Sequence, residues 1–292
     1  MELVVTIRSF DKYRQFVRFF DGIIIGKYFT SAFDLSKDEM KELSVQCKKD
    51  DKKCYVVIDD FISENDKLFF YEYFDFVVSL NPDGIYFHDL AVMDAAKKYG
   101  VLNKLIYDGK TLISNSLEAA YYLNTGIDSV VIARELTLEE IMPIIIMNKD
   151  RVDMQLFGHL RMSYSKRWFL NNYFKEIDTE YDYYKKESLT ITEENRDYHM
   201  PIYEDKNGTK IYTDYIFDCY EEYESLKDYL RRGIIDTLFV SDKEVIQYLR
   251  DLRRINRFNA QFLKYSFERK NPEHYGTGYL YVKTNKSKDE QD

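Results

Sequence analysis

The chain has 292 residues, of which 45% are hydrophobic, so it can bury the core of one large globular domain or two small ones. Its formal net charge of −9 argues against non-specific nucleic-acid binding over the whole surface, because that affinity comes from basic side chains. The three cysteines form no CxxC pair, and no apolar run approaches the length of a membrane span. We therefore expect a cytoplasmic protein without disulfides and without membrane contact.

Short runs rich in β-branched residues alternate with stretches of helical period along the chain. The runs are 3–7, 22–26, 54–58, 84–88, 105–108, 129–133, 153–157 and 237–240. Ser36 and Ser116 have the positions of helix N-caps between them, and Gly100 and Gly126 those of helix stops. This alternation predicts a parallel sheet, and its size and strand number predict an α/β fold, a TIM-like (β/α)8 barrel. A doubly wound sheet is the alternative, but no G-x-G-x-x-G follows the first run.

Polar residues, most of them ionisable, follow the predicted strands. They are Arg8, Lys27, Asp59, Asp60, His88, Asp89, Asp108, Arg134, Glu135, His159, Ser241 and Asp242. In a barrel these positions converge on the carboxyl-terminal mouth, where active sites lie. The alternative is that each residue caps the helix that follows its strand. The ring as a whole predicts a site at this mouth.

The stretch FGHLRMSYSKRW, residues 157–168, ends the seventh run with a dense group of polar side chains. Arg161, Lys166 and Arg167, with the hydroxyls between them, can bind a carboxylate or phosphate through charge-assisted hydrogen bonds. The alternative is a helix N-terminus that carries ordinary surface cations. His159 with Ser163 or Ser165 could form a nucleophile and its base, although residues so close in a loop seldom reach attack geometry.

A long insertion, residues 172–229, separates the seventh and eighth runs. Within it, ITEENRDYHMPIYEDKNGTKIY predicts a β-hairpin with Asn207-Gly208 as its turn. An insertion of this length in a barrel is usually a lid, a substrate shelf or an interface. Glu194 and Arg196 are candidates for ligand contact or for ion pairs that fix the insertion over the mouth.

After the eighth run, residues 250–270 are rich in basic and aromatic side chains. Their spacing predicts one helix that gathers its arginines on one side for RNA contact and turns its aromatic rings toward the barrel. The arginines are Arg250, Arg253, Arg254 and Arg257, and the aromatic residues are Phe258, Phe262 and Tyr265. Alternatively, the arginines pair with the acidic stretch 176–197. We expect a barrel domain over 1–243, a basic helix and a short GTGYLYVKT strand within 244–283, and a disordered tail over 284–292.

Four motifs carry a resemblance to a known family. They are SVVIARELTLEEI, FGHLRMSYSKRWFLNNYF, ITEENRDYHMPIYEDKNGTKIY and GTGYLYVKT, in this order. The chain resembles the peptidase U32 (collagenase-like) family, and most of all its short Gram-positive branch. The resemblance implies a barrel-like catalytic domain, and either collagenase-like proteolysis or hydroxylation of the tRNA wobble uridine. Arg134 and Glu135 occupy the family's Arg-Glu pair, and Tyr164, Ser165 and Arg167 match its Tyr-Ser-x-Arg sequence.

The chain departs from this family where relatives hold an iron–sulfur cluster. Arg161 and Trp168 stand in the places of two cluster cysteines, and the later cysteine pair has no counterpart. The eighth strand ends in Val240, Ser241 and Asp242 in place of a Glu-Gly-Arg-like sequence. The resemblance therefore implies no metal or cofactor in this chain, and a cluster only in a longer family paralogue.

These observations predict a subunit of a tRNA wobble-uridine 5-hydroxylation system, with the longer paralogue and possibly tRNA as partners. The alternatives are a collagenase-like protease or hydrolase, or a catalytically inactive structural subunit. The candidate catalytic residues are Arg134, Glu135 and His159. The candidate substrate- or anion-binding residues are Arg161, Tyr164, Ser165, Lys166, Arg167, His88, Asp89, Asp108, Glu194 and Arg196.

Overall fold

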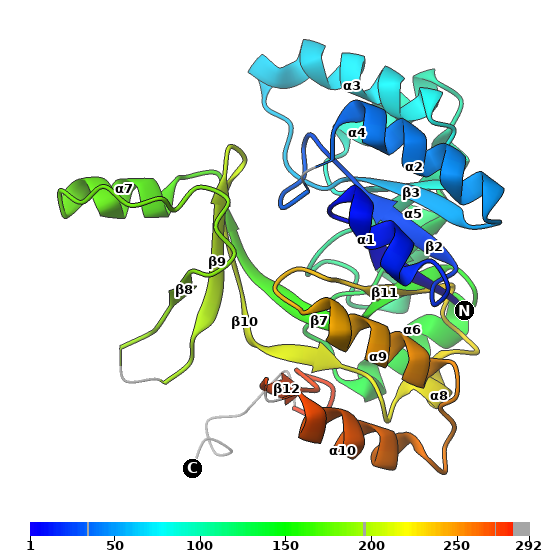
Figure 1. Ribbon diagram of the computed structural model, residues 1–292. Coiled ribbons are helices and arrows are strands. Elements are labelled where there is room, and N and C mark those ends of the chain that lie inside the picture. Colours follow the sequence, from blue (N-terminus) through cyan, green and yellow to red (C-terminus); the bar gives the residue numbers. More distant parts are fainter. Residues whose placement is uncertain (34, 195–196, 272, 283–292) are drawn as a thin grey trace.

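The computed structural model describes residues 1–282 except 34, 195–196 and 272, and it has a closed barrel of eight parallel strands (Figure 1). The barrel strands are β1 (Glu2–Thr6), β2 (Gly22–Ile25), β3 (Lys53–Ile58), β4 (Gly84–Phe87), β5 (Leu105–Asp108), β6 (Ser129–Val131), β7 (Val152–Ser165) and β11 (Arg232–Ile235). Each strand pairs with the next, and β11 closes the ring by pairing with both β7 and β1. The predicted TIM-like barrel is confirmed.

Helices surround the barrel and cover the outer face of its strands. They are α1 (Phe10–Phe16), α2 (Lys37–Lys49), α3 (Lys67–Ser79), α4 (Ala91–Lys98), α5 (Ser116–Leu123), α6 (Leu138–Met147), α8 (Tyr223–Leu226) and α9 (Asp242–Leu252). Ser36 begins α2 with the predicted cap, as a capping box with Glu39. The N-cap of α5 is Asn115, one residue before the predicted Ser116. Ser241 is the N-cap of α9, so for this residue the alternative holds that strand-end polar residues cap the following helix.

The apolar residues divide between two cores because successive strand residues point to opposite faces. Val5 belongs to the large core between strands and helices, whereas its neighbour Val4 belongs to a small cluster inside the barrel with Tyr55 and Tyr86. The barrel interior is thus packed below its mouth, and a ligand of the barrel would bind at the ends of the strands.

The eighth strand lies five residues before its predicted position. The sequence favoured 237–240, but β11 runs from Arg232 to Ile235, and Leu238 and Phe239 form a turn. An arginine can begin this buried strand because the Arg232 guanidinium lies 2.6 Å from Asp128 and 3.1 Å from Asp153. Hydrophobicity alone could not reveal this compensation.

The insertion forms an arm that extends from the barrel, at the left of Figure 1. Beyond the barrel, β7 continues as an antiparallel partner of β10 (Gly208–Asp218), which pairs with β9 (Met200–Asp205) and, through it, β8 (Thr190–Ile191). Helix α7 (Phe169–Glu176) lies on the arm. The predicted hairpin forms, but its turn is Lys206-Asn207, one residue before the predicted Asn207-Gly208, because Gly208 already pairs with Asp205. Gly208 adopts φ +112°, and a Cβ there would lie 2.1 Å from the Ser165 carbonyl oxygen.

The basic stretch after β11 is not one helix. Helix α9 ends at Leu252, and α10 (Ala260–Lys270) begins after a turn. The side chains of Asn256 and Asn259 accept hydrogen bonds from the backbone N–H groups of Phe258 and Asn256, and such local bonds compete with helix formation.

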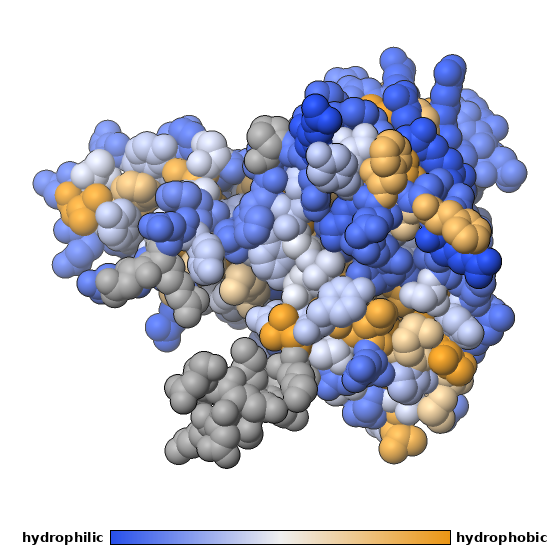
Figure 2. All heavy atoms as spheres, turned by 90° about the horizontal axis from the view of Figure 1, so that it is seen from below, coloured by the Kyte–Doolittle hydropathy of each residue, from blue (hydrophilic) through white to orange (hydrophobic). Residues whose placement is uncertain are grey.

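The predicted direction of the aromatic stripe is also wrong. Phe258, Phe262 and Tyr265 are 84%, 69% and 63% exposed, while Leu263 and Phe267 face the core. Figure 2 looks onto this lower face, where hydrophobic residues stand among hydrophilic ones.

The last described residues form little regular structure. The predicted GTGYLYVKT strand is wrong, because the only pairing there among the described residues is the two-residue β12 (Tyr275–Gly276) beside β10. The predicted disordered tail, 284–292, lies outside the described residues. Within the described ranges, no helix combines the length and the apolar character needed to cross a membrane.

Candidate functional site

A cavity of about 90 Å³ opens at the mouth of the barrel, among the ends of its strands and the base of the arm. Five cationic side chains line it, together with three carboxylates and the His159 ring. The cations are Arg8, Lys110, Arg134, Arg161 and Lys210, and the carboxylates are Asp59, Asp108 and Asp236. Two further buried carboxylates lie behind this lining: Asp60 pairs with Lys210, and Asp205 accepts a hydrogen bond from Ser31, which itself accepts one from Lys210. Among the side chains that line the cavity, five cations face three carboxylates.

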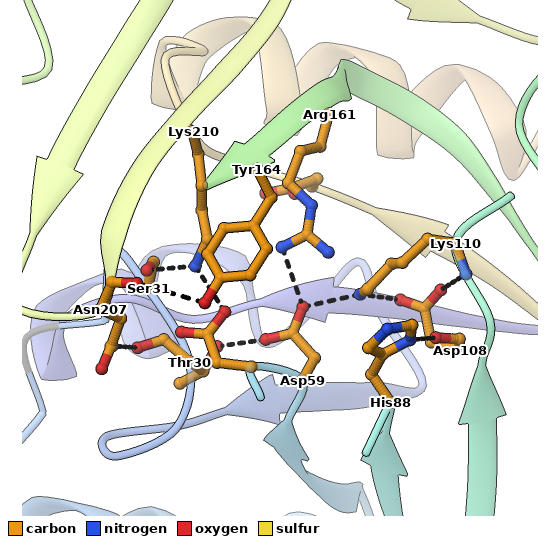
Figure 3. A network of polar contacts seen from close by, with 12 residues as sticks. Thr30, Ser31, Asp59, His88, Asp108, Lys110, Arg161, Tyr164, Asn207 and Lys210 are labelled. Carbon is orange, nitrogen blue, oxygen red and sulfur yellow. Dashed lines mark hydrogen bonds and ion pairs between the residues drawn. The ribbon is translucent and has the colours of Figure 1, made fainter. Parts of the chain in front are cut away.

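Asp59 and Asp108 form the centre of the charged network (Figure 3). The Lys110 ammonium lies between them, 2.7 Å from Asp59 and 2.5 Å from Asp108, and Arg161 lies 3.4 Å from Asp59. Burial alone would raise the pKa of Asp108, but Lys110 and Arg134 outweigh it and lower the pKa to about 2. Burial opposes the shift at Asp59 too, yet Lys110 and Arg161 hold its pKa well below the ordinary value. Both carboxylates are therefore ionised at neutral pH.

The cavity wall nearest the arm is built around Lys210 of β10. Its ammonium lies 2.7 Å from Asp60 and donates a hydrogen bond to Ser31, and it faces the Tyr164 ring, 5.0 Å from the centroid. In Figure 3, Lys210, Tyr164 and Arg161 reach from β10 and β7 toward the strand ends of the barrel. The arm thus contributes side chains to the mouth.

On the opposite wall, Arg8 joins the first and last strands of the barrel. Its guanidinium lies 2.5 Å from Asp236 and donates a hydrogen bond of 2.7 Å to the Ala32 carbonyl. Burial alone would raise the pKa of Asp236, but the adjacent Arg8 outweighs burial and lowers it. Gly158 lets β7 pass close to this point, since a Cβ on it would lie 2.4 Å from the Asp236 carbonyl oxygen, and its φ is +110°.

His159 is buried at the edge of the cavity. Its Nδ1 donates a 2.7 Å hydrogen bond to the carbonyl oxygen of Thr213, because a carbonyl can only accept. Burial lowers the pKa of His159, and the bond to Thr213 only partly offsets it. The neutral ring with its proton on Nδ1 keeps Nε2 as a hydrogen-bond acceptor.

The structure brings several predicted residues together. Arg134, His159, Arg161 and Asp108 all line the cavity. Arg134 donates a hydrogen bond to Gln155, 3.2 Å away, and approaches Asp108 at 3.5 Å. The mouth positions of the barrel therefore gather predicted residues from β5, β6 and β7.

Other predicted residues lie elsewhere. Glu135 is exposed beyond the cavity, and Asp89 accepts hydrogen bonds from the backbone N–H groups of Ile62 and Ala91, as the capping alternative implies. Ser165 accepts a bond from the backbone of Arg167, which is exposed. The remaining predicted residues lie at the rim or on the arm. Tyr164, Lys166 and His88 are at the rim of the mouth, Glu194 is exposed on the arm, and Arg196 lies outside the described residues.

The four arginines after β11 contact neighbours of their own region and of the β1–β2 connection. Arg253 pairs with Asp21 at 2.8 Å, and Arg254 with Asp251 at 2.6 Å. Arg250 and Arg257 lie over the rings of Phe19 and Phe258. The carboxylates that they meet in the described structure are not those of the acidic stretch 176–197, so that predicted pairing is wrong.

Sequence reasoning missed Lys110, Gln155, Lys210 and Asp236. Asp236 follows β11 directly, and its position at a strand end is the signal that would have found it, had the eighth strand been placed correctly. Lys110 stands two residues after Asp108. Lys210 shows no local signal, because it reaches the mouth only through the pairing of β10 with β7.

The motif 157–168 is strand as far as Ser165, and its last residues lead into α7, with Trp168 as the N-cap. The alternative of exposed cations before a helix N-terminus therefore holds for Lys166 and Arg167. Successive residues of a strand advance about 3.3 Å, so His159 and Ser163 are separated by roughly 13 Å along β7. This distance excludes proton transfer from Ser163 to His159. Ser163 is, moreover, exposed.

The residues present do not fit an iron–sulfur cluster. Cys47, Cys54 and Cys219 are buried members of the large apolar core, and Arg161, where the resemblance implies a cluster cysteine in relatives, lines the mouth. Within the described ranges, no group of three or more His, Cys, Asp or Glu side chains is arranged to hold a metal ion. The mouth is instead a set of fixed cations around a small cavity.

Comparison with known proteins places this geometry in a family. The family model described as peptidase family U32 matches residues 28–240. The chain belongs to peptidase family U32. The predicted family is thereby confirmed, and three of the four motifs lie within the matched residues.

Two curated relatives carry different names. The chain is 31% identical over 203 residues to "tRNA hydroxylation protein P2" of Bacillus subtilis (strain 168), covering 68% of this chain and 65% of the relative. It is 30% identical over 148 residues to an uncharacterized protease of Methanocaldococcus jannaschii, covering 49% of this chain and 36% of the relative. The chain thus spans less than two thirds of either relative.

Among solved structures, that of a U32 peptidase is similar with a TM-score of 0.48 and 12% identity, covering 81% of this chain and 92% of the other. A phosphoribosylanthranilate isomerase from Pyrococcus furiosus has a TM-score of 0.46 and 10% identity, covering 87% of this chain and 100% of the other.

Proposed function

We propose that this chain takes part in 5-hydroxylation of the wobble uridine of tRNA, and that its mouth cavity binds a small anion in that process. The relative named tRNA hydroxylation protein P2 supports the first part. The single observation that carries the second is the excess of cations over carboxylates, five to three, among the side chains that line the cavity.

The anion is a carboxylate or phosphate of a small molecule, held by Arg134 and Arg161. Each guanidinium has several donors, and its approach to Asp108 or Asp59, at 3.5 and 3.4 Å, occupies only part of them. Charge-assisted hydrogen bonds from two such groups fix both the position and the orientation of an anion. His159 Nε2 adds an acceptor for a hydroxyl group of the same ligand.

The oxidative chemistry belongs, in this proposal, to a longer cluster-bearing paralogue with which the chain forms a hetero-oligomer. Supporting this assignment, the cysteines of this chain lie in its apolar core. The chain would contribute anion binding and contact with tRNA.

A hydrolase is the second candidate, and one contact favours it. Ser31 accepts a hydrogen bond from Lys210, which resembles the serine–lysine pairs of some hydrolases. However, the Lys210 ammonium is also paired with Asp60 at 2.7 Å, and an ammonium has no free electron pair to take the proton of Ser31. The tRNA proposal is therefore preferred.

Deletion of the gene, followed by mass spectrometry of tRNA nucleosides, tests the proposal. We expect 5-hydroxyuridine derivatives to disappear from tRNA. Their persistence at the wild-type level in a strain without a redundant system would refute the proposal. The hydrolase would be favoured if the purified protein cleaved gelatin or peptides and Lys210→Met abolished this cleavage. An inactive structural subunit predicts that a variant without the mouth cations still restores hydroxylation in the deletion strain.

A further inference from the structure

An aromatic groove lies beside the mouth cavity. Its volume is about 300 Å³, and it runs between the loop after β2, the loop after β3 and the β9–β10 turn. The residues that characterise this aromatic groove are Tyr28, Phe61, Phe69, Tyr164, Lys166 and Lys206. Asp60 also lines the groove, while its partner Lys210 lines the cavity, so the two spaces share a wall.

The groove exposes flat aromatic surface to solvent. Phe61 is 46% exposed, and its ring stacks on Tyr164 with a centroid separation of 5.7 Å and an angle of 23° between planes. Phe69 is 39% exposed and packs edge-on against Tyr28 at 4.8 Å. Exposed aromatic rings beside a polar cavity mark a surface that favours a flat, partly apolar ligand.

These rings are fixed in place before any ligand binds. The Tyr164 hydroxyl donates a hydrogen bond to the Asn207 carbonyl at 3.2 Å, and the Asn207 amide donates one of 2.7 Å to the Thr30 carbonyl. The His88 ring packs edge-on against Phe61 at 5.1 Å. Because the arm is bonded to the barrel at this point, stacking on Phe61 requires little reordering of the protein.

Two lysines border the aromatic surface at the arm, and the carboxylates Asp60 and Asp66 lie at its barrel side. Lys166 and Lys206 are both exposed at the groove, and the Lys206 ammonium lies 4.3 Å from the centroid of the Tyr28 ring. A stacking surface flanked by lysines is the pattern by which proteins bind unpaired nucleotides, with the base on the ring and the phosphates near the cations. The overall charge of −9 makes this local arrangement more selective for one RNA segment than for RNA in general.

We propose that the aromatic groove binds one unpaired nucleotide of the substrate RNA, with its base stacked on Phe61 and its backbone at Lys166 and Lys206. This inference rests on the proposed function, since it takes tRNA as the substrate. The shared wall then brings the bound nucleotide next to the anion in the cavity.

Binding of a synthetic RNA hairpin with an unpaired uridine in its loop tests the inference. The same hairpin with an abasic nucleotide at that position is the matched ligand. We expect the wild-type protein to bind the intact hairpin about 10-fold more tightly, because stacking on one aromatic ring contributes an effect of this order. Phe61→Ala should bind both hairpins with the weaker affinity, and Phe61→Trp should restore the difference.

Two controls separate stacking from charge and from folding. Tyr121→Ala removes a ring that is 70% exposed on α5, outside the groove lining, and should change neither affinity. Lys166→Gln with Lys206→Gln should weaken both hairpins equally. The double variant Trp168→Phe, Phe61→Trp carries a single tryptophan, which lies in the groove. The intact hairpin should quench its fluorescence more than the abasic hairpin does.

The inference would be overturned if the wild-type protein bound the two hairpins equally or bound neither. It would also be overturned if Phe61→Ala still bound the intact hairpin more tightly than the abasic one. The proposed function is judged separately by tRNA from the deletion strain. If the deletion strain loses tRNA hydroxylation but the protein binds both hairpins equally, the groove proposal alone is rejected. If hydroxylation in the deletion strain is unchanged, the proposed function is rejected.

Discussion

The two ends of the barrel carry buried networks of the same residue types, but they differ in balance and in space. At the amino-terminal end, the Arg232 side chain is 2% exposed and pairs with Asp128 and Asp153, while its guanidinium lies over the Tyr55 ring. Arg231 and Lys53 complete this network with Asp128 and Glu2, so three cations meet three carboxylates. At the mouth, five cations and three carboxylates line a cavity.

The difference teaches that buried charge alone does not identify a binding site. Both networks perturb pKa values, because burial and close partners act in each. The amino-terminal network is balanced within the fold and explains why β11 can begin with an arginine. The cavity lining at the mouth has more cations than carboxylates and leaves space, so a ligand of opposite charge can bind there.

Replacement of Arg232 should have the largest effect on folding. Arg232→Met leaves the fully buried Asp153 without its cationic partner, which costs roughly 3–5 kcal/mol of unfolding free energy. Urea denaturation measures this loss. Arg231→Met is the matched control, since its partly exposed pair with Asp128 contributes about 1 kcal/mol or less. Equal losses of unfolding free energy in the two variants would show that the contribution of an ion pair in this network does not depend on its burial.

Asp218, a buried carboxylate outside both networks, tests how stability changes when a buried charge lacks a close cationic partner. Burial raises the pKa of Asp218 to about 6, only partly opposed by Lys264 at 3.8 Å, and one of its oxygens has no hydrogen-bond partner in the described structure. Because the folded pKa lies above the ordinary 3.8, the unfolded chain releases this proton first as pH rises. Stability should therefore fall between about pH 4 and 6, by up to about 3 kcal/mol.

Asp218→Asn removes that titration. Its unfolding free energy, measured in urea at a series of pH values, should lose the decline between pH 4 and 6 and exceed that of the wild type at pH 7. The same pH dependence in variant and wild type would contradict this account of Asp218.

At the mouth, substitution should affect binding more than folding. Arg161→Gln should weaken the binding of inorganic phosphate or citrate by about 10-fold or more, as expected for a lost charge-assisted contact. Asp59 keeps Lys110 as a partner at 2.7 Å, so the loss of stability should be smaller than in Arg232→Met. Isothermal titration calorimetry measures the affinity, with Arg231→Met as the control. Unaltered anion affinity in Arg161→Gln would remove the mouth from the proposal.

The smallest effects should come from the arginines after β11. Arg253 is 48% exposed in its pair with Asp21, so Arg253→Gln should change the unfolding free energy by less than about 1 kcal/mol. Thermal denaturation tests this. Contact with RNA remains a prediction for Arg250, Arg253, Arg254 and Arg257. If such contacts exist, each lost arginine should flatten the salt dependence of tRNA binding by about one unit of slope.

Local patterns in the sequence predicted seven strands, the barrel and part of its mouth. Runs of apolar residues place buried strands, and residues such as Asp108 and Arg134 follow them directly. The eighth strand could not be placed in this way, because Arg232 is tolerated only through partners that are remote in sequence. That error hid Asp236.

The C-terminal region and the arm show the same limit. A helical spacing of charges suggested one helix over 250–270, but asparagine side chains bond to the backbone and break it. Lys210 reaches the mouth through strand pairing between distant segments, which no local pattern reveals.

Complementation of the deletion strain tests most directly whether the mouth, and not the amino-terminal network, serves tRNA hydroxylation. The strain would express the wild type, Arg161→Gln or Arg231→Met at matched levels, and its tRNA nucleosides would be measured by mass spectrometry. We predict that the wild type and Arg231→Met restore 5-hydroxyuridine derivatives, and that folded Arg161→Gln does not. Full restoration by Arg161→Gln would contradict the assignment of the mouth cavity as the functional site.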